Sequence, residues 1–140
     1  MDNIINNYNP KQTDIINDQY NNVIINQCIN QIYIINLNTD RLREKYITII
    51  MQKLNINYKL ITVRKPTQKT YNNVIKISKP LSKKMTIGGV GCYLSHMWWL
   101  HNIVKNNYKN AIIFEDDIIV HKNFLSLFER YLSEKKENNE

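Results

Sequence analysis

The chain has 140 residues, of which 43% are hydrophobic, so it is one domain at most and has enough apolar residues for a core. Its net charge of +7, from 19 basic and 12 acidic residues, favours an anionic partner such as a nucleotide diphosphate. The basic residues are scattered without a compact arginine block, which argues against nucleic-acid binding, and no apolar run reaches the length of a membrane span.

The composition changes along the chain and indicates three parts. Residues 1–28 are rich in Asn and repeat Ile-Ile-Asn irregularly, so we predict a low-complexity extension that has room for a short helix or strand. Residues 29–135 carry the regular patterns of a domain, and 136–140 form a charged tail. The N-terminus lacks the features of a signal peptide, which predicts a cytoplasmic protein. Cys28 and Cys92 are far apart, and reduced thiols are expected.

The first regular elements after the extension predict one βαβ unit. Residues 31–38 are an unbroken run with β-branched and aromatic side chains, typical of a strand buried on both faces. Thr39 or Asp40 then caps a helix. Residues 58–63 predict a second, parallel strand, reached by a right-handed crossover. The apolar positions of the helix follow helical spacing at Leu42, Tyr46, Ile49, Ile50 and Leu54.

The second half of the chain predicts a long connection and then a helix, a strand and a helix. Pro66 and Pro80 exclude long regular elements from residues 64–86, which leave room for a short strand at 74–77. A glycine-rich turn at 87–91 leads into a largely buried helix from about Cys92 to Asn106. A strand opens at Asn110, and a last amphipathic helix follows Asn123. This order predicts an α/β fold, with a parallel sheet core and covering helices.

Three adjacent carboxylates end the last predicted strand, at Glu115, Asp116 and Asp117. Like charges beside a buried strand repel one another and cost desolvation energy, and a divalent cation would remove both penalties. Ligands of open α/β sheets bind at the carboxyl ends of the strands. The first hypothesis is therefore a divalent-metal site at the edge of a nucleotide-binding sheet. The alternative is that the acids only cap the turn that follows.

Two other segments are expected at the same pocket. Asn36 and Leu37 end the first strand and Arg43 follows; Asn suits a uracil edge or a ribose, and Arg suits phosphate. The glycines at 88–91 offer backbone N–H groups to an anion at a helix N-terminus. Simpler interpretations stay open: a helix cap, exposed arginines, and glycines that allow close packing. Trp98 and Trp99 are interpreted as core residues.

These motifs together resemble glycosyltransferase family 25, which includes bacterial lipooligosaccharide galactosyltransferases and procollagen galactosyltransferases. The resemblance runs from about Ile32 to Phe128. Where the family pattern has Glu in the glycine segment, this chain has Gly89, which removes one carboxylate near the expected pocket. The resemblance is carried by Ile34-Ile35-Asn36-Leu37-Asn38 with Arg41 and Arg43, by the segment from Gly88 to His96 that includes Gly-Cys-Tyr-Leu-Ser-His, and by Ile113-Phe114-Glu115-Asp116-Asp117.

The resemblance implies a GT-A-like (Rossmann-like) fold that is incomplete at the C-terminus, because the family domain is considerably longer. It implies metal-dependent, inverting transfer of a hexose, typically galactose from UDP-galactose, to a glycan or a hydroxylysine-type acceptor. The alternative is a truncated, non-catalytic remnant or a donor-binding module of the same fold. The expected partners are the nucleotide-sugar, the glycan or protein acceptor, and a complementing C-terminal half or a second copy of the chain.

The resemblance also implies roles for particular residues, and it assigns no catalytic base. Mn²⁺ or another divalent metal would be held by Glu115, Asp116 and Asp117. The donor would be a UDP-sugar. The residues that would contact it or support its pocket are Asn36, Leu37, Arg43, Gly91, Ser95 and His96.

Overall fold

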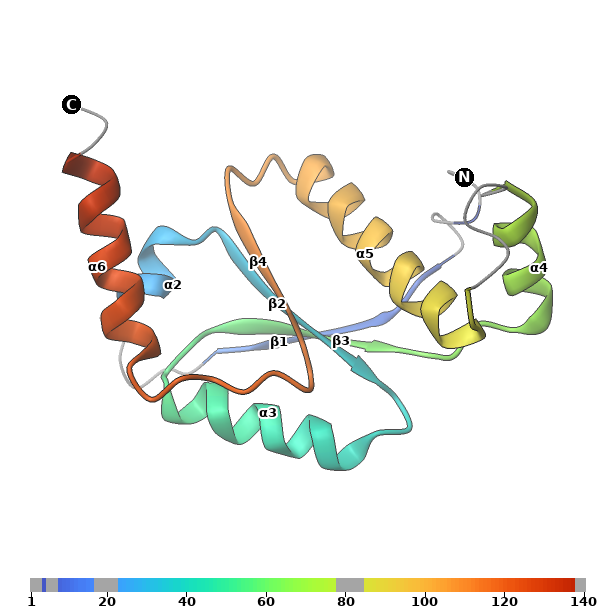
Figure 1. Ribbon diagram of the computed structural model, residues 1–140, viewed down its shortest axis with the longest axis horizontal. Helices are drawn as coiled ribbons and strands as arrows, with labels where there is room; N and C mark the ends of the chain where they lie inside the picture. Colours follow the sequence, from blue (N-terminus) through green and yellow to red (C-terminus); the bar gives the residue numbers. More distant parts are fainter. Residues whose placement is uncertain (1–3, 5–7, 17–22, 78–84, 138–140) are drawn as a thin grey trace.

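The computed structural model describes residues 4, 8–16, 23–77 and 85–137 (Figure 1). Its elements form an open sheet with helices on both faces, an α/β arrangement of the Rossmann-like kind. Among the described helices, none combines the length and the apolar character needed to cross a membrane. In chain order the elements are β1 (Lys11–Ile15), α2 (Ile24–Cys28), β2 (Gln31–Leu37), α3 (Arg41–Lys53), β3 (Tyr58–Val63), α4 (Gln68–Ile77), α5 (Ile87–Lys105), β4 (Ala111–Glu115) and α6 (Phe124–Glu137).

The sheet has the strand order β1-β3-β2-β4. Strand β2 lies parallel to β3 on one side and parallel to β4 on the other, while β1 pairs antiparallel with β3 at the edge. The chain therefore moves from β2 to one neighbour and later crosses back to the other. This reversal places a topological switch point at the carboxyl ends of β2 and β4, which is where open α/β sheets bind ligands.

Alternation along the strands divides the core into two faces. Ile32 and Ile34 of β2 pack on the same side as Ile47 and Met51 of α3. Tyr33, between them, packs on the opposite side against α5. In Figure 1, α3 and α5 accordingly lie on opposite sides of the sheet. Since successive side chains of a strand point to opposite faces, each strand sends alternate residues toward α3 and toward α5.

The elements expected at the centre of the fold are confirmed. The parallel core of β2, β3 and β4 is present, and β3 has the predicted bounds. The cap of α3 is Asp40, whose side chain accepts a hydrogen bond from the backbone N–H of Arg43. Trp98 and Trp99 are core residues, as interpreted from the sequence, with 8% and 0% of their surface exposed.

Two local predictions in the second half of the chain were wrong. The short strand expected at 74–77 is instead the end of α4, and Val74 packs with α5. Helix α5 begins at Ile87 rather than near Cys92, because Thr86 caps it by accepting from the backbone N–H of Gly89. The glycines therefore lie inside the first turns of α5 and not in a preceding turn.

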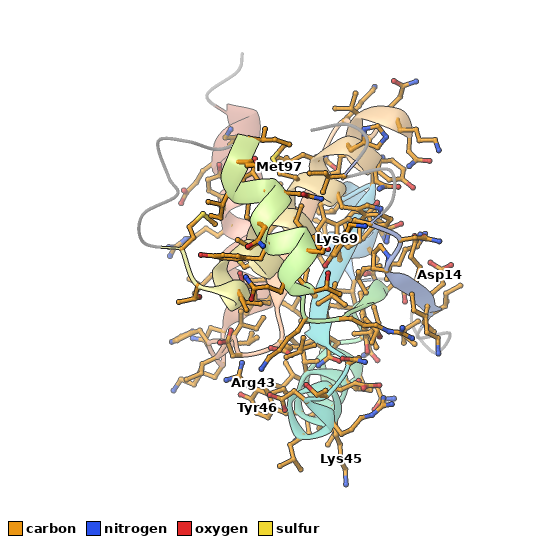
Figure 2. The ribbon with its side chains drawn as sticks, turned by 90° about the vertical axis from the view of Figure 1, so that its right-hand side faces the viewer. Asp14, Arg43, Lys45, Tyr46, Lys69 and Met97 are labelled. Carbon is orange, nitrogen blue, oxygen red and sulfur yellow. The ribbon has the colours of Figure 1, made fainter. Side chains whose placement is uncertain are left out.

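The buried face of α3 also differs from the predicted apolar stripe. Ile47 and Met51 are its buried residues. Leu42, Tyr46 and Ile49 are exposed, and Figure 2 shows Tyr46 on this helix. Apolar side chains occur all around α3, so helical spacing alone did not decide which of them face the sheet.

Part of the stretch predicted as an extension, 1–28, adds to the fold. Strand β1 pairs with β3, and Ile25 of α2 is fully buried in the core beside α3. Residues 1–3, 5–7 and 17–22 of this stretch lie outside the described residues, as do 78–84 of the long connection. Helix α6 continues to Glu137, into the predicted tail 136–140, whose last three residues are also outside the description.

Candidate functional site

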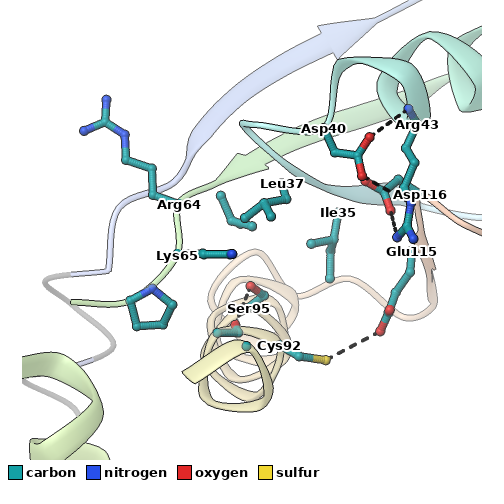
Figure 3. A pocket seen from close by; sticks show the side chains of 14 residues that line it. Ile35, Leu37, Asp40, Arg43, Arg64, Lys65, Cys92, Ser95, Glu115 and Asp116 are labelled. Carbon is teal, nitrogen blue, oxygen red and sulfur yellow. Dashed lines mark hydrogen bonds and ion pairs between the residues drawn. The ribbon is translucent and has the colours of Figure 1, made fainter. Parts of the chain in front are cut away.

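A pocket of about 270 Å³ lies at the carboxyl ends of the parallel strands, beside the first turns of α5 (Figure 3). Its floor is apolar where β2 and β3 end, and charged side chains surround this floor. The pocket thus lies at the switch point of the sheet. It is lined by Ile35, Leu37, Asp40, Arg43, Val63, Arg64, Lys65, Pro66, Gly88, Gly91, Cys92, Ser95, Glu115 and Asp116.

Basic side chains reach this pocket from two elements. Arg43 comes from the first turn of α3, and Arg64 and Lys65 directly follow β3. Both residues after β3 are exposed. Within the described residues, neither Arg64 nor Lys65 forms an ion pair with an acid, whereas Arg43 is paired with three carboxylates. A multiply charged anion such as a diphosphate matches this set of cations.

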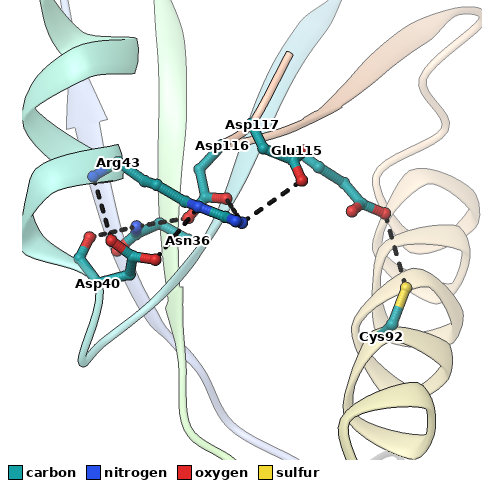
Figure 4. A network of polar contacts seen from close by, with 7 residues as sticks. All are labelled: Asn36, Asp40, Arg43, Cys92, Glu115, Asp116 and Asp117. Atoms are coloured by element: carbon teal, nitrogen blue, oxygen red, sulfur yellow. Dashed lines mark hydrogen bonds and ion pairs between the residues drawn. The ribbon is translucent and has the colours of Figure 1, made fainter.

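The three acids begin at the last residue of β4, and their side chains point in two directions (Figure 4). Glu115 is on the α5 side, where its Oε1 lies 3.6 Å from Cys92 Sγ. Asp116 is on the α3 side, where its Oδ2 accepts a hydrogen bond of 2.7 Å from Asn36 Nδ2. Neighbouring positions at the end of a strand face opposite sides of the sheet, so Glu115 is separated from Asp116 and Asp117, which both contact Arg43.

A polar network holds the carboxylate of Asp116, which is 7% exposed. Asn36 is fully buried, and its Nδ2 also donates to the backbone oxygen of Asp40 at 3.2 Å. The guanidinium of Arg43 lies 3.5 Å from Asp116 Oδ1, 3.4 Å from Asp117 Oδ2 and 3.2 Å from Asp40 Oδ2. The charge of Asp116 is therefore balanced by an arginine and an amide of the chain itself.

A second group of side chains surrounds Glu115 on the α5 side. His96 Nε2 lies 3.2 Å from Glu115 Oε1, and Cys92 donates from its thiol to the same oxygen. Burial raises the pKa of the Cys92 thiol, and the charge of Glu115 and the hydrogen bond to it act in the same direction. The thiol is thus stabilised in its protonated form beside the carboxylate of Glu115.

Comparisons with known proteins agree with these observations. A sequence model of glycosyltransferase family 25, described as an LPS biosynthesis protein family, matches residues 29–140. The chain belongs to glycosyltransferase family 25. A protein of Haemophilus influenzae named "Putative glycosyltransferase" is 33% identical over 102 residues. That alignment covers 69% of this chain and 36% of the relative, so the chain spans about a third of the relative's length. No solved structure matches the chain.

The acids of this family 25 chain do not present their oxygens to one point. Glu115 contacts α5, whereas Asp116 and Asp117 share the guanidinium of Arg43. In the described part of the chain, the group with metal-ligand spacing contains Glu115 but neither aspartate. This arrangement does not fit a Mn²⁺ ion held by all three acids, and we derive no step through such an ion. The three-acid site stays a prediction.

The other residues predicted for the family 25 site lie at different depths. Leu37, Arg43 and Gly91 line the pocket. Ser95 also lines it, but the residue is 2% exposed, and its hydroxyl donates to the backbone oxygen of Gly91 while sharing a hydrogen bond with Tyr8. His96 contacts the pocket only through Glu115.

Arg64 and Lys65 were missed by the sequence analysis, which treated residues 64–86 as a connection. The signal was available, since both follow directly on a strand that was predicted correctly and that runs parallel to β2. Carboxyl ends of parallel strands lie at one edge of a sheet. The reasoning that selected the ends of β2 and β4 therefore applies equally to the end of β3.

Proposed function

We propose that this family 25 chain binds the nucleotide-diphosphate part of a sugar donor in the pocket at the ends of β2, β3 and β4. The observation that carries the proposal is the set of cations around an apolar floor at the switch point, with Arg64 and Lys65 exposed beside it. Lysine and arginine side chains would bind the phosphate oxygens, and Ile35 and Leu37 offer apolar surface to the rest of the donor.

The proposed reaction is transfer of a hexose, galactose from UDP-galactose being the first candidate, to a glycan or a hydroxylysine-type acceptor. In a transfer of this kind the sugar leaves a nucleoside diphosphate, whose negative charge increases as the bond breaks. The cations of the pocket would stabilise that leaving group. The acceptor hydroxyl must lose a proton to a base, and we assign no residue to that role.

Calorimetry with UDP-galactose tests the donor site directly. We expect binding by UDP-galactose and UDP and much weaker binding by free galactose, because the phosphates meet the cations. Lys65→Ala should weaken UDP binding by about three- to tenfold, the loss of one partly exposed charge contact. The matched control is Lys69→Ala on α4, a lysine outside the pocket lining (Figure 2), which should leave UDP binding unchanged.

Product analysis then separates an enzyme from a donor-binding module. Release of UDP in the presence of acceptor supports transfer by this chain. Donor binding without UDP release supports the module. An identical loss in both lysine variants, or no binding of UDP at all, would contradict the donor site.

A further inference from the structure

Helix α5 and strand β4 bring a thiol, an imidazole and a carboxylate together at one place. Glu115 Oε1 lies 3.6 Å from Cys92 Sγ and 3.2 Å from His96 Nε2. The three candidate ligand atoms all lie within 4.8 Å of one another. Cys92 and His96 are four residues apart on α5 and so share a face of the helix, and strand alternation turns Glu115 toward that face.

These separations are close to those of a tetrahedral zinc site. With Zn–S near 2.3 Å and Zn–N and Zn–O near 2.0–2.2 Å, tetrahedral ligand atoms stand roughly 3.4 to 3.6 Å apart. Two of the three pairs are already at about this separation. The side chains of His96 and Glu115 are 41% and 51% exposed, so both have room to adjust around an ion. We propose that Cys92, His96 and Glu115 form a site for Zn²⁺ or a chemically similar transition metal.

The ligand set selects the class of metal. Thiolate and imidazole ligands suit Zn²⁺ and Co²⁺, whereas Mg²⁺, Ca²⁺ and Mn²⁺ prefer oxygen ligands. On binding, the S–H bond of Cys92 breaks as the sulfur–metal bond forms, and the proton passes to the buffer. Three protein ligands leave a fourth position for water or a ligand oxygen. Cys92 and Glu115 also line the pocket, so the ion would lie at its wall.

This site differs from the three-acid site predicted from the sequence, although both include Glu115. Removing Cys92 or His96 disrupts only the new site, and removing Asp117 disrupts only the three-acid site. The inference does not depend on sugar transfer, since metal affinity is measured without donor or acceptor. Failure of the donor-binding test therefore does not decide the test of the metal site, and the reverse is also true.

Metal titration of the chelator-treated full chain tests the inference. Addition of Co²⁺ should produce a thiolate-to-cobalt charge-transfer absorption that saturates at one ion per chain and disappears when Zn²⁺ is added. Cys92→Ser should abolish the absorption. In competition with a chromophoric chelator, Cys92→Ser and His96→Gln should each weaken Zn²⁺ binding at least about tenfold, since even outer-shell partners change metal affinity by that factor.

Matched controls come from the same chain. Cys28→Ser and His101→Gln remove a cysteine and a histidine outside the site, and both should keep the wild-type affinity for Zn²⁺. Asp117→Asn should keep it too. Circular dichroism confirms that each variant is folded. The inference is overturned if the wild type binds neither ion, or if the wild-type affinity for Zn²⁺ survives in folded Cys92→Ser and His96→Gln.

Discussion

Asn36 supports the site from inside the fold. Its amide is fully buried, and Nδ2 donates to the backbone oxygen of Asp40 and to the carboxylate of Asp116. The amide oxygen is buried without a hydrogen-bond partner among the described residues. A hydrogen-bond donor is needed at this position because the poorly exposed carboxylate of Asp116 requires hydrogen bonds or a counter-charge. Asn36 thus sets the position of Asp116 in the pocket wall.

Replacement of this amide by a carboxylate of nearly the same shape should lower the free energy of unfolding at neutral pH. In Asn36→Asp, two carboxylates would lie at the 2.7 Å separation now bridged by a hydrogen bond. We expect a loss of about 3 kcal/mol in the free energy of unfolding. Repulsion raises the pKa of one of the two carboxyls, so the deficit should shrink as the pH falls and that group binds a proton.

Urea denaturation at neutral and acidic pH measures this difference. Asn72→Asp, at an exposed position of α4, is the control and should change the stability by less than about 0.5 kcal/mol. A deficit in Asn36→Asp that is small, or that does not depend on pH, would contradict the assigned role of the amide.

At the scale of elements, a close contact sets how α5 lies against the connection after β3. A Cβ atom on Gly91 would stand 3.0 Å from Cδ and 3.4 Å from Cγ of Pro66. A rigid proline ring gives way poorly, so the backbone of α5 approaches this connection only with glycine at the contact. Pro66 and Gly91 also line the pocket, so this packing shapes one of its walls.

Alanine substitutions at two glycines of α5 separate helix propensity from packing. Gly88→Ala should stabilise the protein by up to about 1 kcal/mol, because its Cβ would meet no atom closer than 3.8 Å. Gly91→Ala gains the same propensity but displaces Pro66, and we expect it to be less stable than Gly88→Ala by about 1–3 kcal/mol. Thermal unfolding checks the order, and equal stabilities would contradict the packing role.

The elements that could be predicted from the sequence are those with one dominant signal. Strand β3 is rich in aromatic, aliphatic and β-branched residues between polar breaks, and Asp40 is a short polar residue at the start of a helix pattern. The bounds of α5 could not be found in this way, because glycines are poor helix formers and only the cap at Thr86 extends the helix over them. Strand β1 was hidden because its identity depends on pairing with β3, a contact distant in sequence.

The candidate site was predictable in position and less so in arrangement. The parallel order expected for the strands predicted that Asn36 and the acids would lie close together, and the amide of Asn36 does contact Asp116. The separation of Glu115 from Asp116 follows from the two-residue period of a strand, but only once the last strand residue is known. The contact of His96 with Glu115 depends on how α5 lies over the sheet, which spacing in the sequence does not specify.

At the scale of the whole molecule, buried tyrosines make the free energy of unfolding depend on pH. Burial is the main cause that raises the pKa of Tyr8, Tyr33 and Tyr58 above the ordinary value of 10.0. Near that value the unfolded chain loses phenolic protons that the folded chain keeps. The folded state is therefore favoured fully below about pH 10 and progressively less above it, as the pH rises toward the raised pKa values.

The free energy of unfolding should consequently fall between about pH 9 and about pH 11. A double variant, Tyr33→Phe and Tyr58→Phe, removes two of these phenols and should show a shallower decline. Tyr131→Phe, at a residue that is 53% exposed, is the control and should keep the wild-type slope. Chemical denaturation across this range measures the slopes, and identical slopes for all three proteins would rule out the linkage.

The tryptophan pair of α5 gives the protein a fluorescent reporter of its own. Trp98 and Trp99 are the two tryptophans of the sequence, and their rings meet edge to face at 4.8 Å between centroids. Both rings are shielded from water, on the helix that also carries Cys92, Ser95 and His96. Emission excited at the indole band therefore originates from one helix, the helix whose first turns line the pocket, and no attached dye is needed to observe it.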